Sequence, residues 1–142
     1  MIPLLNMSLF ILAISSIPSF PSSTSLCVGR QEKSTLKAKS ITLDPSTDEY
    51  QRVLGGPPET ATMHSGLVVL KPGKSVGVHN TEKYEEVLVI LEGQGEMRIT
   101  GGPAMALRAN TVAYCPPRTE HNVVNTGKGK LRYLYVVAIA SK

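Results

Sequence analysis

The feature that most constrains this chain is a series of short apolar runs, most of them closed by a Gly, Pro or Asn turn signal. They are Tyr50–Leu54, Gly66–Leu70, Val87–Leu91, Met97–Thr100, Val112–Cys115, His121–Val124 and Leu131–Ile139. Short strands at this spacing are typical of an antiparallel β-sandwich or barrel. The sequence therefore predicts an all-β fold in a single domain, since 142 residues leave room for only one.

One of these runs admits a second interpretation. Apolar residues between Tyr84 and Leu91 recur at i, i+3, i+4 and i+7, which is the spacing of an amphipathic helix. The same run is rich in β-branched residues, which favour strands. Because its neighbours are also predicted strands, we expect a strand here.

The N-terminal segment differs in kind from the rest of the chain. Residues 1–29 carry no charged side chain, and an apolar stretch at residues 9–14 precedes a segment rich in Ser and Pro. This order is typical of a secretory signal peptide, and the stretch is shorter than the roughly 20 residues of a transmembrane helix. We expect residues 1–26 to be a signal peptide, residues 27–48 a polar lead-in and residues 49–142 the barrel. The mature protein is then secreted or periplasmic, without stable membrane insertion.

The charge pattern argues against a nucleic-acid partner. The net charge is +4, but the basic residues are scattered and form no block. Aromatic residues make up 5% of the chain and Trp is absent, which leaves little surface for stacking bases. We expect a small-molecule ligand or substrate instead.

Two clusters of polar residues stand between the apolar runs. In the first, five residues separate Gly73 from His79, and six separate Glu86 from Gly93. In the second, Pro116, His121 and Asn125 are spaced four and three residues apart. The clusters resemble the two motifs of the cupin family, G-x5-H-x-H-x3–4-E-x6-G and G-x5-P-x-G-x2-H-x3-N. The resemblance covers about residues 60–138 and implies a jelly-roll barrel.

The chain departs from the family motifs at three positions. Thr81 stands where the first motif has its second histidine, and Asn110 and Arg118 stand at two glycine positions of the second. Asn tolerates the left-handed backbone conformation that glycine adopts readily. Thr81 removes a metal ligand, and we expect its hydroxyl to bind a metal-bound water.

The resemblance implies a metal site formed by His79, Glu86 and His121. Two imidazoles and one carboxylate are the ligand set of a facial triad, which leaves coordination positions open. This set favours Fe(II), with Mn, Ni, Zn and Cu as alternatives for the one divalent ion. Glu85 is the rival of Glu86, because neighbouring strand residues face opposite ways; the spacing to Gly93 selects Glu86.

Three functions agree with such a site. In the first, a metalloenzyme with dioxygenase-like chemistry acts on a small acidic or hydroxylated substrate, with Tyr114 and Glu85 as candidate proton-transfer groups. In the second, the barrel binds a small ligand without catalysis. In the third, a metal-free isomerase uses His79 or His121 as a base, oriented by Glu86. Because the final strand is apolar on both faces, a homodimer is a further expectation.

Overall fold

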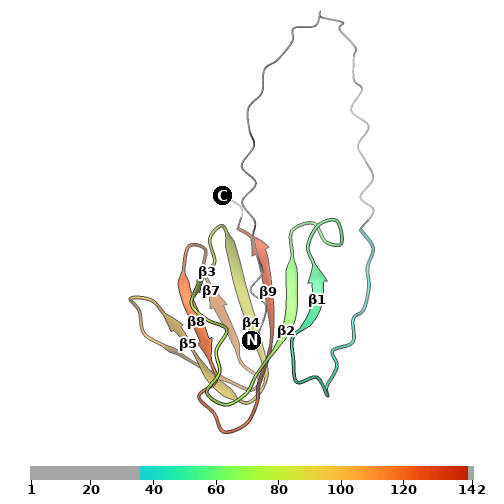
Figure 1. Cartoon of the computed structure of the whole chain (residues 1–142). Helices are drawn as coiled ribbons and strands as arrows, with labels where there is room; N and C mark the ends of the chain where they lie inside the picture. The colour runs from blue at the N-terminus through green and yellow to red at the C-terminus, as the bar shows by residue number, and fades with distance from the viewer. Residues whose placement is uncertain (1–35, 141–142) are drawn as a thin grey trace, which may run out of the picture. The chain divides into compact units, whose positions relative to one another are not determined.

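The computed structural model describes residues 36–140, which form two antiparallel sheets facing each other (Figure 1). The strands are β1 (Gln51–Gly55), β2 (His64–Leu70), β3 (His79–Asn80), β4 (Tyr84–Glu92), β5 (Gln94–Ile99), β6 (Met105–Arg108), β7 (Val112–Cys115), β8 (Glu120–Val124) and β9 (Leu131–Ile139). The five-stranded sheet has the order β1-β2-β9-β4-β7 and the four-stranded sheet the order β3-β8-β5-β6. This arrangement confirms the predicted all-β sandwich.

The predicted apolar runs all became strands, including the ambiguous one at β4. In β4 the burial alternates residue by residue from Glu86 to Ile90, so its period is that of a strand and not of a helix. One strand was not predicted from the sequence, because Met105–Arg108 is a four-residue edge strand. The strand that carries His79 is only two residues long, His79–Asn80.

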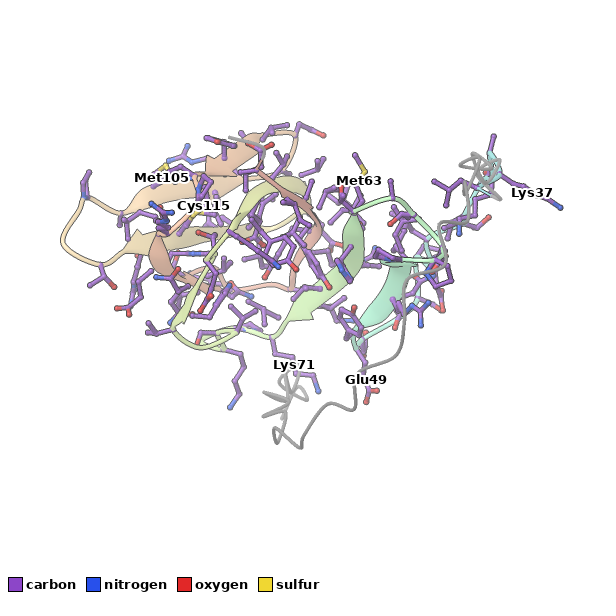
Figure 2. All side chains as sticks on the ribbon, turned by 90° about the horizontal axis from the view of Figure 1, so that it is seen from above. Lys37, Glu49, Met63, Lys71, Met105 and Cys115 are labelled. Atoms are coloured by element: carbon purple, nitrogen blue, oxygen red, sulfur yellow. The ribbon has the colours of Figure 1, made fainter. Side chains whose placement is uncertain are left out.

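The core lies between the two sheets. It is formed by buried side chains from both, namely Val68, Leu70, Leu88, Ile90, Met97, Leu107, Ala113, Cys115, Val123, Leu131 and Tyr133. Figure 2 shows Cys115 and Met105 within the half of the sandwich that holds β5 to β8. Because successive side chains of a strand point to opposite faces of its sheet, the neighbours of these core residues on each strand face outward.

The positions that depart from the family glycines keep a glycine-like backbone. Asn110 has φ 65° and Arg118 has φ 59°, both in the left-handed region. The Arg118 amide also donates to the Glu82 carbonyl at 2.8 Å, which ties the loop to the end of β3. Gly93 has φ 82°, and a Cβ there would come within 2.1 Å of the Lys130 carbonyl oxygen. The turns therefore survive both substitutions.

The residues before β1 cross the outer face of the five-stranded sheet. Gln51 of β1 donates to the Thr42 carbonyl at 3.1 Å, and Arg132 of β9 donates to the Asp44 carbonyl at 2.8 Å. The predicted signal peptide, residues 1–26, lies outside the described residues. Within residues 36–140, no helix is long and apolar enough to cross a membrane.

Candidate metal centre

Three side chains from three strands converge at one end of the sandwich. His79 of β3 and His121 of β8 are directly opposite each other in the ladder, with ring centroids 4.3 Å apart. Glu86 reaches them from β4 in the other sheet. One potential ligand atom from each residue lies within 4.8 Å of the other two. The structure thus brings together the three residues that the sequence predicted.

Both imidazole rings are oriented by backbone carbonyls. The Nδ1 atom of His79 lies 3.0 Å from the Gly77 carbonyl oxygen, and that of His121 lies 3.3 Å from the Thr119 carbonyl oxygen. A carbonyl only accepts, so each Nδ1 carries the hydrogen and donates it. Each neutral ring therefore presents the lone pair of its Nε2 atom, as histidines that bind a metal generally do.

The surroundings of His121 fit a bound cation. Its side chain is fully buried, and its Nε2 atom lies 3.1 Å from Oε2 of Glu86. The two atoms are not aligned as a hydrogen bond, so Nε2 has no hydrogen-bond partner among the described residues. A buried, unpartnered nitrogen is costly. A divalent ion between this nitrogen, Glu86 and His79 would satisfy it, and the donor set suits such an ion.

Two titrating groups beside the triad are shifted. Burial by itself lowers the pKa of His121, but the adjacent Glu86 carboxylate and the Thr119 carbonyl outweigh it and raise that pKa above 6.5. Burial and the Glu86 charge raise the pKa of the Cys115 thiol to about 11. Its sulfur lies 3.5 Å from Nδ1 of His121. Cys115 therefore stays a neutral thiol that packs against the His121 ring. We do not count it among the metal ligands, because the thiolate is the form of cysteine that binds a metal.

The alternation of β4 separates the two neighbouring glutamates. Glu86 is opposite Cys115 of β7 and Val137 of β9, on the inner face, and only 8% of it is exposed. Glu85 points to the outer face, where the Tyr114 hydroxyl donates to its Oε2 at 3.1 Å. The structure therefore does not bring the two candidate proton-transfer groups, Tyr114 and Glu85, to the triad.

Thr81 has a role other than the expected one. Its hydroxyl donates to the Pro116 carbonyl at 2.8 Å and accepts from the Thr119 amide at 2.9 Å. The side chain is buried, and it holds the loop between β7 and β8 against the start of β4. The hydroxyl hydrogen is thus committed to the backbone and not to a metal-bound water.

The sequence reading missed the inward-facing tyrosines of β9 as site residues. Tyr133 and Tyr135 alternate with outward residues and lie on the same face as Glu86, whose charge helps burial to raise the pKa of both phenols. Tyr50, before β1, stacks on Tyr135. The alternation of side chains along β9 is enough to predict from the sequence that Tyr133 and Tyr135 share a face. No sequence signal pairs Tyr50 with Tyr135.

Comparisons with known proteins agree with this fold and site. The cupin domain family matches residues 66–137. An oxalate-binding protein of Thermotoga maritima is 33% identical over 70 residues, which cover 49% of this chain and 57% of that protein. The chain therefore aligns with just over half the length of that relative.

Two solved structures extend the comparison. A Cupin 2 conserved barrel domain protein from Salinispora arenicola is 27% identical with a TM-score of 0.59, covering 73% of this chain and 92% of that one. A cupin protein from Bacteroides fragilis is 20% identical with a TM-score of 0.62, over 73% and 86% of the two chains, which is a likeness of fold alone. The family match spans half of the chain and includes all three residues of the triad. This protein belongs to the cupin family.

Proposed function

We propose that this cupin holds one divalent metal ion through Nε2 of His79, Nε2 of His121 and the Glu86 carboxylate, and binds a small carboxylate ligand there. This proposal rests on one observation. The imidazoles of His79 and His121 are each oriented by a hydrogen bond from Nδ1 to a backbone carbonyl, and both lie beside the Glu86 carboxylate. When bound, the metal supplies a Lewis acid with open coordination positions. Fe(II) fits this donor set well, and Mn, Ni, Zn and Cu are the alternatives.

The class of ligand is supported by the relative from Thermotoga maritima, which is described as oxalate-binding. Oxalate is a small dianion, and a divalent ion held by two neutral imidazoles and one carboxylate keeps a net positive charge. A small dicarboxylate is therefore attracted to this site in a way that a neutral molecule is not. We take oxalate as the probe for this class.

The structure favours binding over catalysis among the predicted functions. The two groups that we predicted to transfer protons in dioxygenase-like chemistry, Tyr114 and Glu85, are on the outer face. A matched assay compares oxygen consumption by the metal-loaded protein with and without added oxalate. Consumption that depends on oxalate would favour the enzyme.

A second candidate is the metal-free site. Nε2 of His121 lies 3.1 Å from Oε2 of Glu86, so with its hydrogen on Nε2 the imidazole would be a base oriented by this carboxylate. In that case the pair would be active after complete removal of metal, whereas the metal-dependent function would be lost.

Elemental analysis of the purified protein tests the proposal, after incubation with Fe(II), Mn(II) or Zn(II). We expect close to one metal ion per chain in the parent and none in His121→Ala. His64→Ala is the matched control, because His64 of β2 is a histidine outside the triad. Retention of metal by His121→Ala, or no metal in the parent, would contradict the proposal.

We also propose that the protein is exported, on the basis of the uncharged and apolar N-terminal segment. Expression of the full chain with mass analysis of the exported product tests it. A product that retains residues 1–26 would contradict cleavage of a signal peptide.

We also propose that the protein forms a homodimer, which is supported by the apolar residues on the outer face of the final strand. Light scattering of the purified protein measures its mass directly. A monomer at every concentration tested would contradict it.

A further inference from the structure

The inner face of β9 carries two tyrosines beside the triad. In the ladder between β4 and β9, Glu86 is opposite Val137, and Leu88 is opposite Tyr135. Tyr135 is thus the diagonal neighbour of Glu86, and such pairs lie about 7–8 Å apart. Tyr135 and Glu86 lie on the same face of the sheet, and the Glu86 charge acts on the Tyr135 phenol. In Figure 1, β2, β9 and β4 run side by side in the five-stranded sheet.

Tyr50 completes a pair of phenols with Tyr135. Their rings stack with centroids 6.5 Å apart and planes 19° from parallel, and their hydroxyl oxygens are 3.0 Å apart. Gly66 of β2 makes room for this contact, because a Cβ there would come within 2.5 Å of the Tyr50 ring. Tyr50 is 37% exposed, whereas Tyr135 packs against the core. The pair therefore runs from solvent to the interior.

The two hydroxyls together leave one hydrogen unused. Each phenol carries one O–H, and their mutual hydrogen bond consumes one of the two. Burial, the contact with Tyr50 and the Glu86 charge raise the pKa of Tyr135, so its phenol stays protonated. Arg52 of β1 does not compete for an anion here, because its guanidinium is bound to Glu59 at 2.8 Å. The pair thus offers a neutral hydrogen-bond donor on the face of the sheet that also carries Glu86.

We propose that the Tyr50–Tyr135 hydroxyl pair binds the second carboxylate of a small dicarboxylate whose first carboxylate is bound at the metal. This inference rests on the proposed function and deepens it, because it names the residues that distinguish a dicarboxylate from a monocarboxylate. A site that hydrogen-bonds a ligand group discriminates strongly against an analogue that lacks it.

Calorimetric titration of the metal-loaded protein with oxalate and with acetate tests this inference. In Tyr135→Phe and in Tyr50→Phe we expect an oxalate affinity about tenfold lower than in the parent, because a hydrogen bond to a charged group is lost. The acetate affinity is expected to stay unchanged. Tyr114→Phe is the matched control, since it removes a hydroxyl of the same kind that faces outward and bonds Glu85.

The metal content of each protein separates this inference from the proposed function. Full metal content with lowered oxalate affinity in both inner variants, and parental affinity in Tyr114→Phe, would support the inference. Full metal content with unchanged oxalate affinity would overturn it and leave the metal site standing. An equal loss of oxalate and acetate affinity would also overturn it. A parent that retains no metal would overturn the proposed function, and this inference with it.

Discussion

The inner and outer faces of the five-stranded sheet are built from the same strands but meet different surroundings. On the inner face, Leu88 is fully buried and Glu86 reaches the two histidines. On the outer face, Val112 is 67% exposed and Tyr114 51% exposed. A one-residue step along β4 or β7 therefore moves a side chain from the candidate metal centre to solvent. Chemical type alone does not reveal this difference, because each face carries a glutamate and a tyrosine.

The largest effect on stability is expected for Leu88→Ala. Its side chain has no exposed surface and packs in the core, so its removal leaves a cavity. We expect the free energy of unfolding to fall by about 2–5 kcal/mol, measured by urea denaturation. Val112→Ala on the outer face is the control, with a change below about 0.5 kcal/mol. Equal losses of unfolding free energy in both variants would contradict the difference in burial between the two faces.

The contrast between the neighbouring glutamates is tested by Glu86→Gln and Glu85→Gln. Glu86→Gln removes the charged ligand, so we expect metal affinity to fall at least about 100-fold, since even residues that only support a ligand cost 10–100-fold. Glu85→Gln is expected to keep the parental affinity. Competition with a chelator of known strength measures both. A loss in Glu85→Gln alone would show that β4 is shifted by one residue relative to the described register.

The role of Thr81 is tested by Thr81→Val, which keeps the shape and removes the hydroxyl. The variant leaves the Pro116 carbonyl and the Thr119 amide without this partner. We expect a loss of about 1–2 kcal/mol in the free energy of unfolding. Metal content after loading is expected to stay at the parental level. Loss of the metal without loss of stability would instead place the hydroxyl among the metal-binding groups.

The pH dependence of the metal-free protein tests the contact between His121 and Glu86. The pKa of His121 is raised in the folded state, so the stabilisation is fully present below pH 6.5 and is lost as the pH rises through the folded pKa. We expect the free energy of unfolding of chelator-treated protein to decrease over that rise, in urea titrations at several pH values. The control is His121→Gln, which lacks the titrating group. An equal decrease in the variant would assign the effect to another residue.

The smallest effect is expected for Tyr114→Phe. Its hydroxyl bonds Glu85 on an exposed face, where such contacts contribute little. We expect a change below about 0.5 kcal/mol in the free energy of unfolding and unchanged metal content. A loss of metal or of oxalate binding in this variant would show that Tyr114 takes part in the site.

The sequence alone determined every strand of the sandwich except Met105–Arg108, and its resemblance to the cupin motifs selected the three residues of the triad. The strand positions follow from short apolar runs bounded by turn residues, which can be recognised in the sequence without knowing which strands pair. The family spacing selected Glu86 over Glu85, and the structure agrees because Glu86 lies on the same face of β4 as the core residues Leu88 and Ile90.

Only the tertiary structure decided what the remaining polar groups do. Thr81 is committed to the backbone of Pro116 and Thr119, and Tyr50 reaches Tyr135 across β2 because Gly66 leaves the space open. These contacts join residues far apart in the chain, so their partners follow from strand order and packing. A sequence pattern specifies which way a residue faces on its own strand, whereas its neighbours on other strands depend on how the sheets assemble.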